Sequence, residues 1–255
     1  MTGSGRIVTA IVVATYVSRV ERSAEGVPNH PVFGWLKPGD SARLRIEAER
    51  NEIQQQRLRE QTVRLRRAQE ETVRVLAAAV ELRDGYTGAH IRRVAAYATT
   101  LYDVVAPGRL VYEEAIGFTV HDIGKLGIPD AILLKPGPLT RVEERVMRKH
   151  PIMGAALIQN LDFLRGSVHL VRHHHERWDG FGYPDGLRRR DTPLAARVFS
   201  VADSFDAATT NRPYRPARST DEAVASIVAM SGTAYDPEVV EAFQFAVGAG
   251  RLNVK

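Results

Sequence analysis

The chain has 255 residues, a net charge of +5 and no cysteine. Its length and its 44% content of hydrophobic residues are enough for a buried core, which excludes an intrinsically disordered chain. The absence of cysteine excludes disulfides and thiolate metal sites, so any bound metal must have nitrogen and oxygen ligands.

Residues 1–41 are predicted to form an N-terminal segment and linker. Residues 7–17 are an apolar, β-branched run, well short of the roughly 20 residues that span a bilayer as a helix. A buried strand is favoured; the alternative is a signal-peptide core, but no small-x-small cleavage site follows it. Glycine and proline recur through residues 23–41, which is typical of a linker. We therefore expect a cytoplasmic protein.

Residues 42–75 are predicted to form one long helix, because they contain no glycine or proline and are rich in Arg, Glu, Gln and Leu. Leu44, Leu58 and Leu65 share a heptad position, but polar residues interrupt the same series. A coiled-coil homodimer and a single helix packed on the next domain both stay open. The arginines alternate with glutamates, as on a solvated face, so no stable nucleic-acid complex is expected.

The compact domain is predicted over residues 76–255. Apolar residues at three- and four-residue spacing after Thr72 indicate a helix that faces its core. Residues 112–122 form a further predicted helix, ended by Gly124. This helix would present His121 and Asp122 to one metal centre, since an imidazole and a carboxylate are both ligands of divalent ions.

A capping box formed by Thr140 and Glu143 is predicted to start another helix. Pro151 disfavours helical geometry in the residue before it, so this helix must stop near His150. The same proline suits the first position of the next helix. His150 is therefore expected at a helix junction, where its side chain can point inward.

Residues 173–175 are consecutive histidines at the end of an amphipathic segment, followed by a turn-rich run over 179–184. Because the triplet is internal, it is not an expression tag, and a metal or phosphate role is predicted. Residues 194–209 form another apolar helix that carries Asp203 and Asp206. Such carboxylates are costly to bury unless they are paired or coordinated.

Short motifs follow one another in a fixed order along the chain. They are Arg83-Asp84 with Tyr86-Thr87 and His90, His121-Asp122-Ile-Gly-Lys125, His174-His175-Glu176, Gly182-Tyr183-Pro184, Asp203-Ser-Phe-Asp206-Ala, Asn211-Arg212-Pro213-Tyr214-Arg215, and Asp236-Pro237. Together they resemble the HD-GYP branch of the HD-domain phosphohydrolases over about residues 72–246. A lone His-Asp pair would mean little, whereas the agreement of several motifs in order and spacing is specific.

The resemblance implies an all-α fold, an HD-domain helical bundle with a metal-centred pocket, preceded by the long helix and the short N-terminal segment with its strand. The implied metal ligands are His90, His121, Asp122, His150, His174, His175 and Asp203. Their imidazoles and carboxylates suit two divalent ions bridged by Asp122. Iron or manganese is favoured, with zinc or nickel as alternatives. Members with three metals have a glutamate where this chain has Tyr86, a poor ligand, so two metals are expected.

The implied activity is a metal-dependent phosphodiesterase that hydrolyses cyclic di-GMP to pGpG, GMP or both by attack of a metal-activated hydroxide. The implied catalytic residues are Asp122, Lys125 and Asp84, and the implied substrate-binding residues are Arg212, Arg215, Lys125, Gly182 and Tyr183. Lys125 would contact a phosphoryl oxygen or the bridging water, and Asp84 would orient it or relay a proton. The loop around Tyr183 would border the guanine pocket or dock a diguanylate cyclase partner.

Two alternatives stay open at this point. The first is a catalytically weak signalling module that binds cyclic dinucleotides. The second is an HD phosphohydrolase of another nucleotide, which the spacing of histidine and aspartate permits. The Gly-Tyr-Pro run argues against the second.

Overall fold

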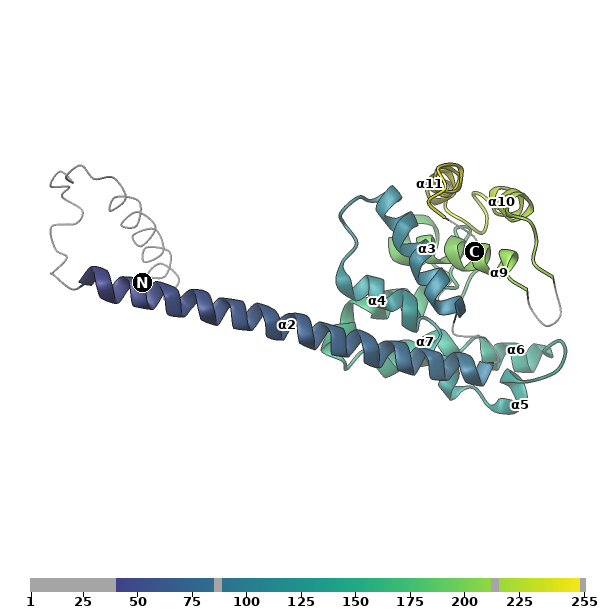
Figure 1. The fold of residues 1–255 in the computed structure, drawn as a ribbon. Coiled ribbons are helices and arrows are strands. Elements are labelled where there is room, and N and C mark those ends of the chain that lie inside the picture. Colours follow the sequence, from purple (N-terminus) through teal and green to yellow (C-terminus); the bar gives the residue numbers. More distant parts are fainter. Residues whose placement is uncertain (1–39, 85–88, 212–215, 253–255) are drawn as a thin grey trace. The chain divides into compact units, whose positions relative to one another are not determined.

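The computed structural model describes residues 40–84, 89–211 and 216–252, and in these ranges the regular elements are all helices. The α-helices are α2 (Asp40–Asp84), α3 (Ala89–Val105), α4 (Tyr112–Val120), α5 (Asp130–Leu133), α6 (Arg141–Met147), α7 (His150–Ile158), α8 (Val168–His173), α9 (Leu194–Thr209), α10 (Thr220–Val228) and α11 (Pro237–Gly248). The 3-10 helices are η1 (Ile123–Gly127), η2 (Asp162–Ser167) and η3 (Arg189–Asp191). The predicted all-α fold is confirmed (Figure 1). The strand predicted within residues 7–17 lies outside the described residues.

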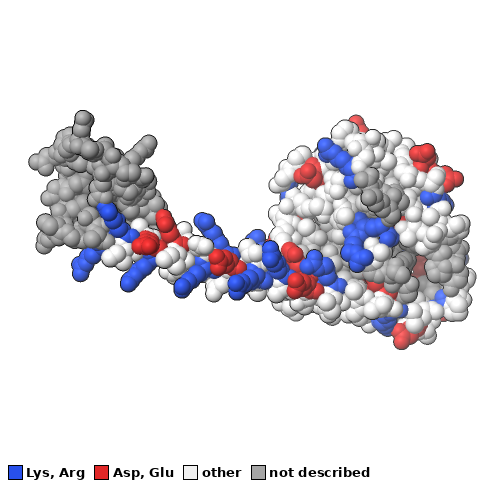
Figure 2. Space-filling view, viewed as in Figure 1, with Lys and Arg blue, Asp and Glu red and all other residues white. Residues whose placement is uncertain are grey.

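Helix α2 is continuous, so the helix predicted over residues 42–75 and the one predicted after Thr72 are a single element. Figure 2 shows acidic and basic side chains interleaved along it, as expected of a solvated face. Among its described side chains, the buried ones begin at Val73 and include Ala77 and Val80. No helix in the described ranges has the length and apolar character needed to cross a membrane.

Contacts divide the chain into two compact units, Met1–Gln69 and Glu70–Lys255. The predicted domain limits at residues 41 and 75 stay predictions. The second unit contains every described residue that the motifs single out, and the rest of the fold is described for this unit alone.

Two hydrophobic clusters form the core of the second unit. The larger one joins α3, α9, α10 and α11 (Figure 1), with Phe199, Phe205 and Phe243 fully buried in it. Burial of each such ring stabilises the fold by about 1.5–3 kcal/mol. The smaller cluster joins the end of α2 to α4, α7 and α8 through residues such as Val120 and Val171.

The helix starts follow the local sequence signals. Thr140 Oγ1 accepts a hydrogen bond from the Glu143 backbone N–H at 3.3 Å, and Glu143 Oε2 accepts one from the Thr140 N–H at 2.7 Å. The predicted capping box of α6 is therefore confirmed. His150 is the first residue of α7, with Pro151 in its first turn, so the predicted helix junction is also confirmed.

Helix α4 ends at Val120, two residues earlier than predicted, and η1 begins at Ile123. The reason is a close approach of the backbones of η1 and α7. A Cβ atom at Gly124 would lie 1.9 Å from the carbonyl oxygen of His150 and 2.4 Å from the nitrogen of Gly154. Only glycine fits there. The turn before η1 is thereby held directly beside the start of α7.

We predict that Gly124→Ala destabilises the fold by at least about 2 kcal/mol, because the added methyl group forces two backbones apart. The matched control is Gly248→Ala at the end of α11, where an added Cβ has no atom within 4 Å. This control should be neutral or more stable by up to about 1 kcal/mol. Urea unfolding followed by circular dichroism measures both, and equal midpoints for the two variants would contradict the prediction.

Candidate metal centre

Several side chains from distant parts of the sequence converge at the start of α7. Ligand atoms of Asp122, His150, His174 and His175 all lie within 4.8 Å of one another. Asp122 lies in the turn before η1, His150 begins α7, and the other two histidines follow α8. Imidazole nitrogens with a carboxylate oxygen are a donor set for a borderline divalent ion, so these residues fit a metal.

The orientation of the histidine rings is set by their own backbone. Nδ1 of His121, His150 and His174 donates to the carbonyl oxygen three residues earlier in the chain, at 3.1, 2.9 and 2.8 Å. Because a carbonyl can only accept, each Nδ1 carries the proton. Each Nε2 is therefore the nitrogen that faces Asp122, and it is the atom that the neutral ring offers to a metal.

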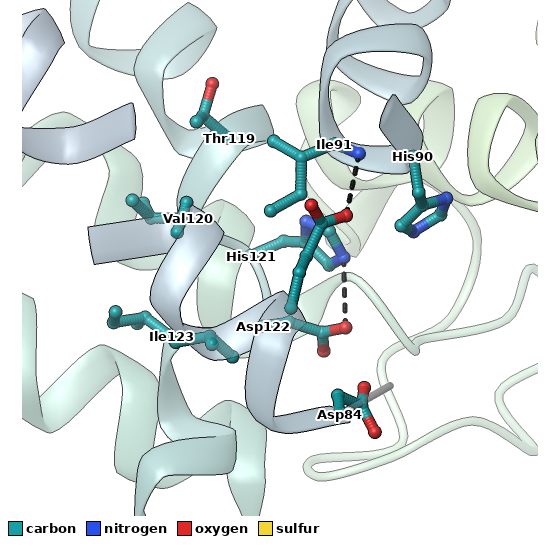
Figure 3. A pocket seen from close by; sticks show the side chains of 11 residues that line it. Asp84, His90, Ile91, Thr119, Val120, His121, Asp122 and Ile123 are labelled. Atoms are coloured by element: carbon teal, nitrogen blue, oxygen red, sulfur yellow. Dashed lines mark hydrogen bonds and ion pairs between the residues drawn. The ribbon is translucent and has the colours of Figure 1, made fainter. Parts of the chain in front are cut away.

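Asp122 is the carboxylate at the middle of this group. Its Oδ1 lies 3.1 Å from Nε2 of His150, and its Oδ2 lies 3.2 Å from Nε2 of His121 and 2.8 Å from Nζ of Lys125. Figure 3 shows the contact with His121. Burial raises the pKa of Asp122, but the nearby cation of Lys125 and the bonds from the histidines outweigh it and hold the pKa well below its ordinary value. Asp122 is therefore an anion at neutral pH.

The ammonium group of Lys125 lies between two carboxylates. Its Nζ is 2.5 Å from Oδ2 of Asp84, at the end of α2, and 2.8 Å from Oδ2 of Asp122. Burial lowers the pKa of Lys125, but the attraction of the two carboxylates exceeds this effect and the pKa is raised. Lys125 therefore keeps its proton. It can donate to an anion at this position, and it cannot act there as a general base.

His174 and His175 are neutral at physiological pH. Burial is the main cause of the low pKa of both rings, and neighbouring imidazoles add to it. The pKa of His174 falls to about 4, and that of His175 falls well below its ordinary value. A neutral imidazole is the form that binds metals, so neither ring has to lose a proton first.

His90 and Asp203 lie on the other side of His121. Nε2 of His90 is 3.6 Å from Oδ1 of Asp203, and the rings of His90 and His121 are 6.2 Å apart. Figure 3 shows His90, His121 and Asp122 around one cavity. The described ligands predicted from the sequence are thus brought together. Tyr86, Arg212 and Arg215 lie outside the described residues.

The loop with the Gly-Tyr-Pro run is held against the centre by Glu176. Its carboxylate accepts hydrogen bonds from the backbone N–H groups of Asp185, Gly186 and Leu187 at 2.7, 3.1 and 3.1 Å. At Gly182 a Cβ would lie 2.4 Å from the nitrogen of Arg177, so glycine is required for this close approach. Glu176 belongs to the His174-His175-Glu176 motif, but the sequence alone predicts no role for it.

This loop places the ring of Tyr183 against the ring of His175, a predicted metal ligand. Its ring stacks on that of His175, with the ring centres 4.7 Å apart, and the guanidinium carbon of Arg148 lies 5.0 Å from the centre of the tyrosine ring. Burial raises the pKa of Tyr183 to about 12, so the phenol stays protonated. Of the described substrate-binding candidates, Tyr183 and Lys125 lie beside the metal cluster.

Glu81 was missed by the sequence reasoning. It is only 4% exposed, and its Oε1 accepts the backbone N–H of Ile91 at 3.0 Å, which ties the end of α2 to the first turn of α3. Its Oε2 has no hydrogen-bond partner within the described part of the chain. Burial raises its pKa. A carboxylate in the apolar stretch before Asp84 was the signal that could have indicated it.

The match to protein families covers the same region as these contacts. The model of the HD domain matches residues 74–239. The chain belongs to the HD-domain family. The start of the match falls within α2, and its end falls within α11, so it includes all the ligand residues.

Known relatives agree with this assignment. The chain is 40% identical over 176 residues to a protein of Thermotoga maritima named cyclic di-GMP phosphodiesterase, covering 68% of this chain and 48% of that protein. It is 35% identical over 184 residues to a Vibrio cholerae protein named 3'3'-cGAMP-specific phosphodiesterase 2, covering 70% of this chain and 35% of that protein. The HD-GYP resemblance of the motifs is confirmed by such relatives. The chain spans about half of the first relative and about a third of the second.

A solved structure shares the fold. It is a crystal structure of a cyclic GMP-AMP specific phosphodiesterase of Vibrio cholerae, with a TM-score of 0.56 and 18% identity. The alignment covers 72% of this chain and 49% of that one. At this identity the likeness supports the helical fold alone.

We predict that the metal-free chain loses stability as the pH falls from 7 to 5, in part through His174. Its folded pKa of about 4 lies below the ordinary value of 6.5, so between these values only the unfolded chain takes up the proton and acid favours unfolding. The contribution is about 1.4 kcal/mol per pH unit. His174→Gln should therefore lose about 2 kcal/mol less than the wild type between pH 7 and pH 5. Urea unfolding in EDTA checks this, and an equal loss in both chains would refute it.

We also predict that Glu176→Ala speeds hydrogen exchange at the amides of residues 185–187 by about 10- to 100-fold, since a hydrogen bond to a charged group contributes about 1.5–3 kcal/mol. Exchange followed by NMR or mass spectrometry measures this effect. Glu222→Ala is the control, because Glu222 accepts a backbone N–H from Ser219 at the distant α10 cap. Unchanged exchange in the loop of Glu176→Ala would show that the carboxylate does not hold it.

Proposed function

We propose that this chain is a metal-dependent phosphodiesterase that hydrolyses cyclic di-GMP to pGpG, GMP or both. The observation that carries the proposal is the partly buried cluster of Asp122, His150, His174 and His175 with the protonated Lys125 beside it. The cluster combines ligands for a divalent ion with a fixed cation for a phosphate. The similarity to a protein named cyclic di-GMP phosphodiesterase supports this substrate.

We propose a centre of two divalent ions, iron or manganese. Asp122 supports this number because its two oxygens face different histidines, His150 on one side and His121 on the other. One ion would be held by Asp122, His150, His174 and His175, and the other by His90, His121, Asp122 and Asp203. Bound ions of this kind lower the pKa of water to near neutrality and neutralise charge on phosphoryl oxygens.

Lys125 is proposed to bind the phosphoryl group. Because the ammonium lies between Asp84 and Asp122, it is held in place before substrate arrives and needs no reorganisation to donate to a phosphoryl oxygen. Asp84 orients it from the end of α2. Asp84, 2.5 Å from the ammonium, is also proposed to relay a proton that the attacking water releases at the centre.

The Gly-Tyr-Pro loop and two arginines are proposed to make the remaining contacts with the substrate. Gly182 allows the backbone to approach closely, and Tyr183 offers a protonated phenol and a flat ring next to His175. The phenol can donate a hydrogen bond to an acceptor on a guanine base. Arg212 and Arg215 are proposed to hold phosphate oxygens, because the guanidinium group binds them with two parallel hydrogen bonds.

We also propose the protein partners of this chain and its cellular compartment. The loop around Tyr183 is proposed to dock a diguanylate cyclase partner. A homodimer through α2 is supported by its exposed Leu58 and Leu65, which share a heptad position. The cytoplasm is the proposed compartment, and a chain without cysteine is compatible with it.

The test uses Lys125→Met, with Lys135→Met as a matched control. Both lysines contact a carboxylate, Lys125 with Asp84 at 2.5 Å and Lys135 with Glu143 at 2.6 Å, but only Lys125 lies beside the cluster. The chain is purified without oxygen, loaded with Fe²⁺ or Mn²⁺ and incubated with cyclic di-GMP, and chromatography separates the products. Lys125→Met should lower kcat about 10²- to 10³-fold with unchanged metal content, since one fixed donor to a developing charge contributes this much. Lys135→Met should match the wild type.

The same assay separates the alternatives. Cleavage of 3'3'-cGAMP in preference to cyclic di-GMP would assign the specificity of the Vibrio cholerae relative. Retained but uncleaved dinucleotide would indicate a binding module, and cleavage of mononucleotides alone would indicate another HD phosphohydrolase. Full activity in Asp122→Ala would exclude the metal centre.

A further inference from the structure

Four of the predicted ligand histidines have their Nδ1 atoms fixed in one of two ways. His121, His150 and His174 use a backbone carbonyl oxygen three residues earlier in the chain. His90 instead has its Nδ1 2.7 Å from Oδ2 of Asp206, a side chain on α9. The orientation of His90 therefore depends on a contact between two helices that are far apart in the sequence.

Asp206 is itself held by Arg93. The carboxylate is 1% exposed, and it accepts from Nε of Arg93 at 2.5 Å through Oδ1 and from Nη2 at 3.1 Å through Oδ2. This is the paired geometry in which a guanidinium group fixes the plane of a carboxylate. The Nη2 of Arg93 also donates to Oγ1 of Thr210 at 3.1 Å, so the arginine is anchored at the end of α9 as well.

The four groups form two pairs across the α3–α9 contact. His90 and Arg93 are one turn apart on α3, and Asp203 and Asp206 are one turn apart on α9, so each pair shares a helix face. Nδ1 of His90 meets Asp206, and its Nε2 faces Oδ1 of Asp203 at 3.6 Å. An ionised carboxylate can only accept, so Nδ1 donates its proton to Asp206, and Nε2 is the nitrogen that faces the Asp203 side.

We propose that Asp206, held by Arg93, is a positioning residue for His90 and fixes its Nε2 as the ligand atom for the ion shared with His121 and Asp203. This inference rests on the two-ion centre proposed above. An acid that orients a ligand histidine typically changes metal affinity by 10- to 100-fold. The other ion, at His150, does not depend on Asp206, so only one of the two should be affected.

The chain contains a matched control for this arrangement. Asp185 accepts from Nε2 of His173 at 2.9 Å and from Nε and Nη2 of Arg172 at 2.7 and 2.8 Å. Both ring nitrogens of His173 are engaged, because Nδ1 donates to the carbonyl oxygen of His169 at 2.8 Å. Asp185 thus contacts one histidine and one arginine, as Asp206 does, but its histidine is not a proposed metal ligand.

The experiment compares the wild type, Asp206→Asn and Asp185→Asn as full chains loaded with Mn²⁺. Metal per chain after dialysis is measured by mass spectrometry, and the Kd of each ion by competition with a chelating dye. The wild type and Asp185→Asn should retain two ions. Asp206→Asn should retain about one, with the Kd of the other ion raised about 10- to 100-fold. Two ions with wild-type affinity in Asp206→Asn would overturn the inference.

Two further variants separate a positioning role from a structural one. If Asp206 acts through His90, adding Asp206→Asn to His90→Ala should cause no further loss of metal, and an additional loss would overturn the inference.

Arg93→Gln leaves the bond between His90 and Asp206 in place and serves if Asp206→Asn does not fold. Arg93→Gln should raise the Kd of the same ion by a smaller factor than Asp206→Asn does. An unchanged Kd would refute the role of the Arg93–Asp206 pair. A wild-type chain with fewer than two ions would instead refute the two-ion centre itself.

Discussion

The anionic carboxylate of Asp122 is largely withdrawn from water, with 22% of its side chain exposed, so its neighbours must balance its charge. An isolated anion there would cost several kcal/mol, whereas the cation of Lys125 and the rings of His121 and His150 surround it on both oxygens. The side chain of Lys125 is 16% exposed and has Asp84 as a second partner. The electrostatic network therefore extends from the centre to the end of α2.

The packing of the elements brings the polar centre and the apolar core into direct contact. The turn that carries Asp122 reaches His150 because Gly124 lets η1 lie directly against α7. The ring of Phe199 contacts His121, with centres 4.5 Å apart, so the larger hydrophobic cluster directly adjoins the polar centre. The apolar core and the ionisable groups are consequently not separable parts, and a change in backbone spacing at Gly124 affects both.

Much of the site could be predicted from the sequence, because its residues belong to short motifs with a fixed order. The capping box at Thr140 and the junction at His150 are local signals, and the structure confirms them. The roles of Asp206 and Glu176 could not be predicted, since they depend on which groups the fold places opposite each carboxylate. The continuity of α2 was also missed, because a change in composition does not by itself end a helix.

The short-range hydrogen bonds of His121, His150 and His174 have a consequence for metal uptake. Each ring is oriented by its own helical turn, so its rotamer does not depend on an ion being present. The fold itself therefore preorganises these three ligands, in contrast to small zinc domains that fold only on loading. Exchange of one metal for another should then be limited by ligand dissociation and access from solvent, with no refolding step.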